Sequence, residues 1–219
     1  MAGSDILAHV FKQAALDYGA VEDNEYPDLI LINHGIDGVD NTGALNDSFK
    51  NEIINMVEQL ENNGANIIGI ACNTAHTYLS DINIQTTTTV VNLIDAVARY
   101  AATKNHDYLL LTSSASKDQK LYHKYLDKYN VSYHETTAKQ QVLLDKAIGL
   151  IMAYRLTEAG KLIDQVLLSA KKSGHTAVIA GCTELPIAIA NCQKNHDLVV
   201  INSNEILAQA LLKEYYQSN

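Results

Sequence analysis

Short apolar runs alternate with longer amphipathic stretches along most of this chain, and this alternation constrains the fold more than any other feature. Short apolar runs bounded by turn residues are typical of buried strands. Strands that alternate with helical stretches form βα units and a parallel sheet. We therefore predict an α/β fold. The predicted strands are Asp28–Asn33, Ile67–Ala71, Thr89–Asn92, Tyr108–Thr112, Ser132–Glu135, Thr176–Ala180 and Leu198–Asn202.

The stretches between these strands have the apolar spacing of helices that lie on a sheet. Asp5–Tyr18, Leu45–Glu61 and Ala159–Lys172 each place apolar residues three or four positions apart, so each can bury one face. Gly64 and Gly174 follow two helical stretches directly before a strand. This is the usual position of a glycine that ends a helix.

One unit of the sequence occurs twice. Ile68–Thr74 and Val178–Glu184 each contain an apolar strand, a cysteine and short polar residues, and a helical stretch follows. We infer two pseudo-symmetric domains, each a mostly parallel sheet flanked by helices. In such folds ligands bind outside the carboxyl ends of the strands. We predict one domain from residues 1–95 with 203–219, a second from 96–202, and a substrate cleft between them.

Charge and cysteine content exclude several classes of protein. The 219 residues suit one large domain or two small ones, and the net charge of −9 argues against a nucleic-acid binder, which needs clustered Lys and Arg. No apolar run approaches the roughly 20 residues that cross a bilayer. Three cysteines fit reduced thiols in the cytoplasm better than a disulfide framework. Neither a Cys-x-x-Cys pair nor a His-rich tract indicates a metal site.

The cysteines of the repeated unit, Cys72 and Cys182, are the strongest candidates for chemistry. Each lies where a predicted strand ends and a helix begins, so free N–H groups and the helix dipole favour an anion there. We expect this position to lower the thiol pKa from about 8.5 toward neutrality. The alternative is that both are buried core residues, as free cysteines often are. Cys192, late in the predicted helix Leu185–Cys192, is expected to be structural.

Two thiols suit a reaction that inverts a carbon centre. Such a reaction needs a base on one face and an acid on the other, with the roles exchanged in the reverse direction. A thiolate and a thiol meet this requirement when their pKa values lie near the working pH. A carbon acid beside a carboxylate is very weak, so preorganised donors must also stabilise the developing charge. Asn73, Thr74 and Thr183 place short polar groups next to the thiols.

At these residues the chain resembles the aspartate/glutamate racemase family, and most closely its aspartate racemase branch. The matching strings are Ala71-Cys72-Asn73-Thr74-Ala75-His76 and Ala180-Gly181-Cys182-Thr183-Glu184-Leu185. Weaker likeness extends over nearly the whole chain. The resemblance implies an amino-acid racemase, an isomerase that uses no pyridoxal phosphate or other cofactor. It also implies a homodimer with a small amino acid as its substrate.

The resemblance also assigns roles to residues of this sequence. Cys72 and Cys182 match the catalytic pair of the family. A second set matches groups that bind the substrate or line the cleft: Asn33, Asn73, Thr74, Ser113, Ser116 and Thr183. Glu184 could orient or tune the second cysteine. Which cysteine serves which enantiomer is left open.

The chain departs from the family pattern where an acidic substrate would bind. Asn41 stands in place of an arginine, and Met152 aligns with a lysine that helps to hold the distal carboxylate. Arg155 lies close to Met152 in sequence and is a possible substitute. Removal of a charged partner leaves a costly unpaired anion. We therefore expect a racemase whose substrate need not be acidic.

The beginning of the sequence departs as well. Family members begin with a strand and a glycine-rich turn, and Met1-Ala2-Gly3 resembles the tail of that turn. The first strand is therefore absent from this sequence. Two expectations follow: either the sheet lacks that strand, or the natural chain carries it before Met1.

Several polar residues have alternative interpretations. His76 lies one helical turn after Cys72 and could tune it or bond to nearby backbone. His34 could enter the cleft, and Asp5 could approach Cys72 or cap the first helix. A group of charged residues is interpreted as a solvated helix face: Lys117, Asp118, Lys120, Lys124, Asp127 and Lys128.

Other functions remain open at this stage. Maleate isomerisation or hydantoin racemisation would use the same pair of cysteines. A non-catalytic small-molecule-binding relative is the alternative from a different class, because the first strand and the arginine are missing. Rapid reaction of at least one thiol near neutral pH would distinguish an enzyme from a binding protein.

Overall fold

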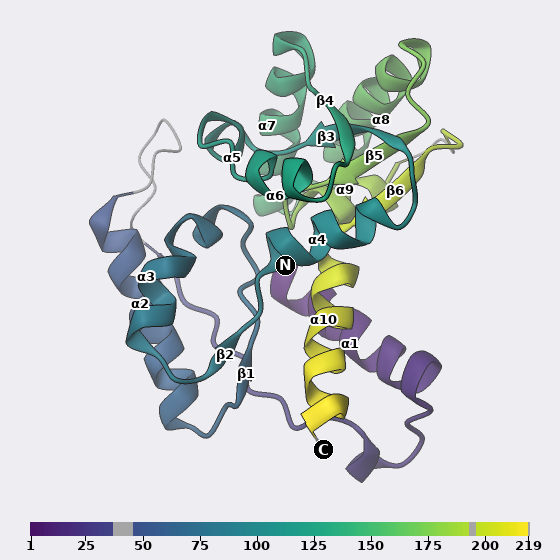
Figure 1. Ribbon diagram of the computed structural model, residues 1–219. Coiled ribbons are helices and arrows are strands. Elements are labelled where there is room, and N and C mark those ends of the chain that lie inside the picture. The colour runs from purple at the N-terminus through teal and green to yellow at the C-terminus, as the bar shows by residue number, and fades with distance from the viewer. Residues whose placement is uncertain (37–45, 193–195, 219) are drawn as a thin grey trace.

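The computed structural model contains two parallel sheets with helices around them (Figure 1). It describes residues 1–36, 46–192 and 196–218. The predicted α/β class is confirmed. The strand order is β1-β2 in the smaller sheet and β4-β3-β5-β6 in the larger one.

The larger sheet consists of four strands that the sequence predicts. They are β3 (Asp107–Leu111), β4 (Ser132–Glu135), β5 (Ala177–Ala180) and β6 (Val199–Asn202). All pairs are parallel, with Leu109 opposite Val178 and Ile179 opposite Ile201. β5 is buried along its whole length, as expected of a parallel strand covered on both faces.

Successive residues of β3 pack into different cores. Leu109 and Leu111 face helices α7 (Ala138–Met152), α8 (Leu156–Lys172) and α9 (Leu185–Ala190). Tyr108 and Leu110 face the opposite side, where α4 (Leu93–Ala102), α6 (His123–Lys128) and the terminal helix pack. The two-residue period of a strand therefore supplies one core on each face of this sheet.

The smaller sheet is short. β1 (Ile67–Ile68) and β2 (Thr89–Val90) pair in parallel over two residues each. Helix α2 (Asp47–Asn62) covers it with Phe49, Ile53 and Val57, together with the 3₁₀ turn η2 (Thr74–Tyr78) and α3 (Leu79–Gln85).

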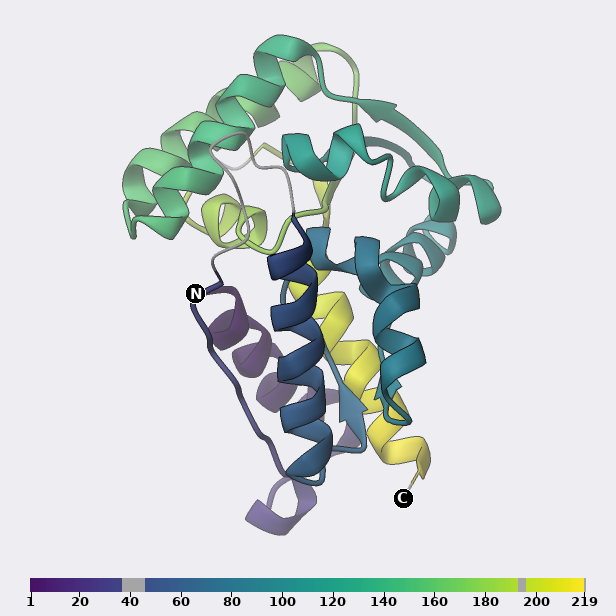
Figure 2. The ribbon, with the colours of Figure 1, turned by 90° about the vertical axis from the view of Figure 1, so that its left-hand side faces the viewer.

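Two helices from the ends of the described chain pack side by side near β1. Helix α1 (Ala2–Tyr18) contacts α10 (Ser203–Ser218), and α10 also contacts β1 and α4 (Figure 2). The terminal helix thus lies against the smaller sheet. The exact domain division at residues 95 and 203 stays a prediction. The remaining short helices are η1 (Asp23–Glu25) and α5 (Ser114–Asp118).

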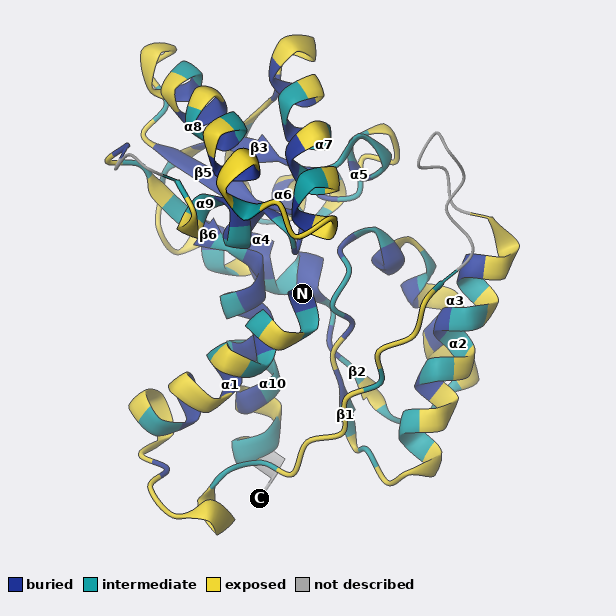
Figure 3. Ribbon diagram, turned by 180° about the vertical axis from the view of Figure 1, so that it is seen from behind, coloured by how far each residue is buried: buried dark blue, intermediate teal, exposed yellow. Residues whose placement is uncertain are grey.

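The predicted strand Asp28–Asn33 is wrong. This segment is extended but joins no ladder, and Leu29, Ile30 and Leu31 are 43%, 49% and 56% exposed. Figure 3 shows it as a yellow trace on the surface. A groove of about 440 Å³ separates it from β1, lined by apolar residues of α1 and α10. The segment has a strand-like sequence but no neighbouring backbone to bond.

Two glycines end helices as predicted. Gly64 and Gly174 follow α2 and α8 with φ of 87° and 88°. This left-handed conformation is easily adopted only by glycine. After each glycine the backbone turns directly toward a strand, β1 or β5, that leads to Cys72 or Cys182.

Candidate active site

The two cysteines come from different sheets and meet where their strands end. Cys72 follows β1, and Cys182 follows β5 by two residues. Burial is the main cause that raises the pKa of both thiols, and the negative charge of Glu184 raises both further.

Hydrogen bonds join the two cysteine-bearing loops directly. Thr183 Oγ1 donates to Ala71 O at 3.3 Å, so the residue after one cysteine contacts the residue before the other. Thr74 Oγ1 and Ser116 Oγ share a hydrogen bond of 3.0 Å. These contacts bring together residues that the sequence places 112 and 42 positions apart.

Glu184 lies against the second cysteine. The Cys182 thiol donates to Glu184 Oε2 at 3.1 Å, and Thr183 Oγ1 lies 3.0 Å from the same oxygen. Burial is the largest cause that raises the Cys182 pKa, and the charge and hydrogen bond of Glu184 follow. Both effects stabilise the protonated thiol, because a buried anion beside a carboxylate is unfavourable.

The Cys72 sulfur is in a different environment. Burial and Glu184 raise its pKa, but backbone N–H groups of Ala75 and Thr74 donate to the sulfur and act in the opposite direction. The pKa of Cys182 is raised well above its usual value by burial and then by the charge and hydrogen bond of Glu184, and the backbone N–H of Glu184 acts in the opposite direction. Cys72 is therefore the thiol that ionises more readily in the unliganded protein.

The expectation that helix N-termini lower both thiol pKa values is wrong. Cys72 precedes a five-residue 3₁₀ turn, η2, and Cys182 precedes a six-residue helix, α9. Such short segments have few aligned peptide dipoles. Burial of the thiols outweighs them, so the pKa shifts are upward.

The turn formed by residues 113–116 follows β3 and is held in place by α7. Ser113 caps α5 by accepting from Ser116 N at 3.3 Å, and Ser116 Oγ also receives a hydrogen bond from Ser113 Oγ. Asp145 accepts from Ser114 N at 3.0 Å and from Ser114 Oγ. Ser116 is buried and connects this turn to Thr74, so the turn forms one wall beside the first cysteine.

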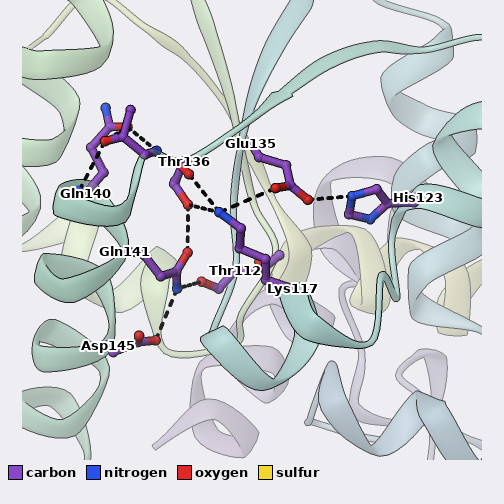
Figure 4. A network of polar contacts seen from close by, with 9 residues as sticks. Thr112, Lys117, His123, Glu135, Thr136, Gln140, Gln141 and Asp145 are labelled. Atoms are coloured by element: carbon purple, nitrogen blue, oxygen red, sulfur yellow. Dashed lines mark hydrogen bonds and ion pairs between the residues drawn. The ribbon is translucent and has the colours of Figure 1, made fainter.

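A polar network lies behind this turn (Figure 4). Lys117 Nζ donates to Thr136 O at 2.7 Å and lies 3.5 Å from Glu135, which also pairs with His123. Gln141 links Thr136 to Thr112 O and Asp145. Lys117 is thus not part of a solvated face, and this part of that interpretation is wrong. The charge of its ammonium group is balanced by Glu135 within this network.

His76 has a structural arrangement. Leu93 N donates to its Nε2 at 3.1 Å, so the proton is on Nδ1, which donates to Cys72 O at 2.9 Å. Burial lowers the pKa of the ring. The histidine therefore fixes the backbone at Cys72 and does not bond to the thiol.

Three other predicted residues lie elsewhere. Asn33 is exposed on the extended segment, and His34 lies 3.9 Å from Glu52. No recorded contact joins either of them to a cysteine loop. Asp5 accepts from Asn204 Nδ2 at 2.7 Å, and the same nitrogen donates to Thr183 O at 2.9 Å. Asp5 therefore supports the backbone of Thr183 through Asn204. No sequence motif predicts this link.

The residues linked to acidic-substrate binding also lie away from the thiols. Met152 is 75% exposed at the end of α7, and Arg155 pairs with Glu158 on the surface. Arg99, the second of the two arginines, pairs with Asp95. Asn41 lies outside the described residues. In the described part of the chain, no arginine contacts the cysteine loops.

Cys192 differs from the catalytic candidates. Its Sγ lies 3.6 Å from Gly160 O, between α8 and the end of α9. Burial and the nearby Asp164 raise its pKa to about 12. Its sulfur contacts backbone oxygens of Gly160 and Ala188, so it links α8 to α9.

Two features are absent from the described residues. No helix among them is long and apolar enough to cross a membrane. No group of three or more His, Cys, Asp or Glu within the described ranges is arranged to hold a metal ion.

The two helix-flanked parallel sheets form an α/β fold that known racemases share. The Asp/Glu/Hydantoin racemase family model matches residues 20–211, so the chain belongs to that family. Racemases are isomerases.

Known relatives cover nearly all of the chain. The broad specificity amino-acid racemase RacX of Bacillus subtilis is 22% identical over 203 residues, which are 92% of this chain and 88% of the relative. Aspartate racemase of Picrophilus torridus superposes with a TM-score of 0.79 at 25% identity, covering 97% of this chain and 90% of that one. An aspartate racemase homologue from Pyrococcus horikoshii gives 0.72 at 24% identity, over 97% and 95% of the two chains.

Proposed function

We propose that this protein is a cofactor-independent amino-acid racemase in which Cys72 and Cys182 act as paired base and acid at Cα. The observation that carries the proposal is that the loops of two cysteines from separate sheets meet: Thr183, next to Cys182, donates to the carbonyl of Ala71, next to Cys72. Family membership supports the reaction class, and the thiol pair supplies groups for both faces of a substrate carbon.

The difference between the thiols assigns their resting roles. Burial, together with the charge and hydrogen bond of Glu184, keeps Cys182 protonated, so it is poised as the acid. Cys72 receives backbone N–H bonds and is poised as the base. A bound substrate adds an ammonium group near the thiols, and a nearby cation favours the thiolate. The roles exchange for the opposite enantiomer, since the product leaves Cys72 protonated and Cys182 ionised.

The substrate carboxylate is proposed to bind between the two loops. Asn73, Thr74 and Thr183 flank the cysteines, and Ser116 with Ser113 extends this row of polar groups. Neutral donors that are already fixed can stabilise the charge that develops next to Cα when the proton leaves. Asn33 remains a proposed cleft residue on the strength of the resemblance alone.

The substrate side chain is proposed to be neutral. Both arginines pair with carboxylates away from the thiols, and Lys117 is bonded inside the network of Figure 4. Residues 37–45, which include Asn41, contain no lysine or arginine. An aspartate side chain would need such a partner, because an uncompensated buried charge is costly. The relative named as a broad specificity racemase agrees with this proposal.

A panel of single enantiomers tests the function. Each amino acid is incubated with the protein, and the two enantiomers are separated by chiral chromatography. We expect inversion of one or more neutral amino acids, lost in Cys72→Ala and in Cys182→Ala but kept in Cys192→Ala. Efficient turnover of aspartate would contradict a neutral substrate. Full activity of either of the first two variants would contradict the paired thiols.

A second candidate is hydantoin racemisation. The family description includes hydantoin racemases, and a neutral ring needs no cationic partner. A 5-substituted hydantoin therefore belongs in the same panel, and its inversion without turnover of any amino acid would favour this candidate.

We further propose that the protein acts as a homodimer in the cytoplasm. The three cysteines are unpaired in the structure, which suits a reducing compartment. Light scattering of the purified protein measures the mass: about twice the 24.0 kDa of one chain would support the dimer, and a single-chain mass would contradict it.

A further inference from the structure

Asn73, directly after the first cysteine, has one unused hydrogen-bonding group. The residue is 2% exposed, and its Nδ2 is a buried nitrogen without a hydrogen-bond partner. Buried donors are rarely left unpaired, because each lost bond to water costs free energy. A buried, unpaired N–H donor beside a reactive thiol can bind an anionic group of a ligand.

The other end of the same amide is fixed by Tyr122. Its hydroxyl donates to Asn73 Oδ1 at 2.5 Å, and the tyrosine is 1% exposed. Burial raises the pKa of the phenol far above its usual value, so the hydroxyl keeps its proton at any working pH. A phenol proton pointing at the amide selects the carbonyl oxygen as its acceptor and leaves Nδ2 facing the other way.

The tyrosine ring also contacts the second cysteine loop. A β-carbon added to Gly181 would lie 2.8 Å from Tyr122 Cε2 and 3.0 Å from Cζ. The ring therefore fills the space beside the residue that precedes Cys182. Tyr122 contacts both half-sites: its hydroxyl bonds to the residue after Cys72, and its ring packs on the residue before Cys182.

We propose that Tyr122 is a positioning residue that fixes the Asn73 amide with Nδ2 toward the cleft, ready to donate to the α-carboxylate of the substrate. This inference rests on the proposed function, because it assigns Asn73 to the carboxylate of an amino acid. Tyr122 touches no reacting atom in this scheme. It prevents the amide from turning its carbonyl oxygen toward an anion.

A compound that binds but cannot react tests the positioning role of Tyr122 separately from catalysis. 2-Aminoisobutyrate has the ammonium and carboxylate of every α-amino acid but no α-proton, and its carboxamide lacks the carboxylate. Calorimetry with Tyr122→Phe, which keeps the ring against Gly181, is expected to show about a tenfold weaker affinity for 2-aminoisobutyrate, since a bond to a charged group is worth at least that factor. The affinity for the carboxamide is expected to change much less.

A double-mutant cycle separates positioning from general packing. In an Asn73→Ala background the Tyr122→Phe change is expected to have no further effect, because the amide that it positions is gone. Asn73→Asp keeps the acceptor for Tyr122 but directs an oxygen at the carboxylate, so 2-aminoisobutyrate should bind at least tenfold more weakly. In turnover, Tyr122→Phe should raise KM more than it lowers kcat.

Three results would overturn the inference. The first is a Tyr122→Phe variant that binds 2-aminoisobutyrate as tightly as the wild type does. The second is a Tyr122→Phe change that weakens binding as much in the Asn73→Ala background as in the wild type. The third is a wild-type protein that does not bind 2-aminoisobutyrate. Failure of the racemase proposal would look different. In that case 2-aminoisobutyrate binds and Tyr122→Phe weakens it, but no amino acid is inverted.

Discussion

Gly181→Ala tests how closely the two cysteine loops must fit. The Gly181 backbone is fixed, because its N–H donates to Leu111 O at 2.8 Å. The added β-carbon would lie 2.8 Å from Tyr122 Cε2 and 3.0 Å from Thr112 Cγ2. Carbon atoms in ordinary contact are about 3.5–4.0 Å apart. The ring must therefore retreat by about 0.7–1.2 Å, and its hydroxyl moves with it.

The expected cost has a structural and a functional part. Overpacking of a buried site destabilises by about 1–3 kcal/mol. For a chain of this size that lowers Tm by about 2–4 °C for each kcal/mol. Displacement of the ring also disturbs the 2.5 Å bond to Asn73 and the position of Cys182. Because about 1 Å of misplacement can cost a hundredfold in rate, we expect kcat/KM to fall by about that factor.

Thermal unfolding and initial racemisation rates measure the two parts. Gly149→Ala is the matched control: Gly149 lies exposed in α7, and an added β-carbon would have no neighbour within 4 Å. This control should keep full activity and gain about 0.5–1 kcal/mol of stability, since alanine favours helix. Gly181→Ala with wild-type Tm and rate would refute the close fit at Tyr122.

Three further predictions concern individual ionisable groups. Glu184→Gln should lower the pKa of Cys182 by removing the negative charge beside it, so iodoacetamide should modify this thiol faster at neutral pH; an unchanged rate would contradict the coupling. Glu61 accepts hydrogen bonds from Thr87 and Thr86, which lower its pKa to about 2. Its contribution to stability should therefore be present above about pH 4.5 and be lost as pH falls toward 2, so the Tm difference between the wild type and Glu61→Gln should vanish there. A difference that persists at pH 2 would show another origin. Cys192→Ser should keep its rate, because this thiol lies between helices, and lost activity in a folded variant would show that its structural assignment is wrong.

Much of the fold could be predicted from local pattern. The larger sheet is readable because its strands are short apolar runs buried on both faces, as in β5. Asp28–Asn33 has the same local pattern but fails as a strand. Strand formation needs a bonded neighbour, and the groove beside β1 supplies none. A local pattern does not contain that information.

Part of the candidate site could likewise be predicted from the sequence, and part could not. Cys72 and Cys182 stand out because the same reactive residue type recurs in two similar units. The upward shift of both thiol pKa values was not predictable from helix position, since it depends on burial and on a carboxylate reached through folding. The roles of Asp145 and Asn204 were likewise hidden, because each acts through hydrogen bonds to residues far away in the sequence.

The isotopic outcome of turnover in D2O tests the central claim most directly. One enantiomer of an accepted amino acid is converted to a few per cent, and mass spectrometry then measures deuterium at Cα in the product and in the recovered substrate. A base on one face and a separate, solvent-exchanged thiol on the other predict a fully deuterated product and an undeuterated substrate. Deuterium-free product would mean that a single group returns the proton it removed. That result, or unchanged conversion by Cys72→Ala or Cys182→Ala, would contradict the two-thiol mechanism.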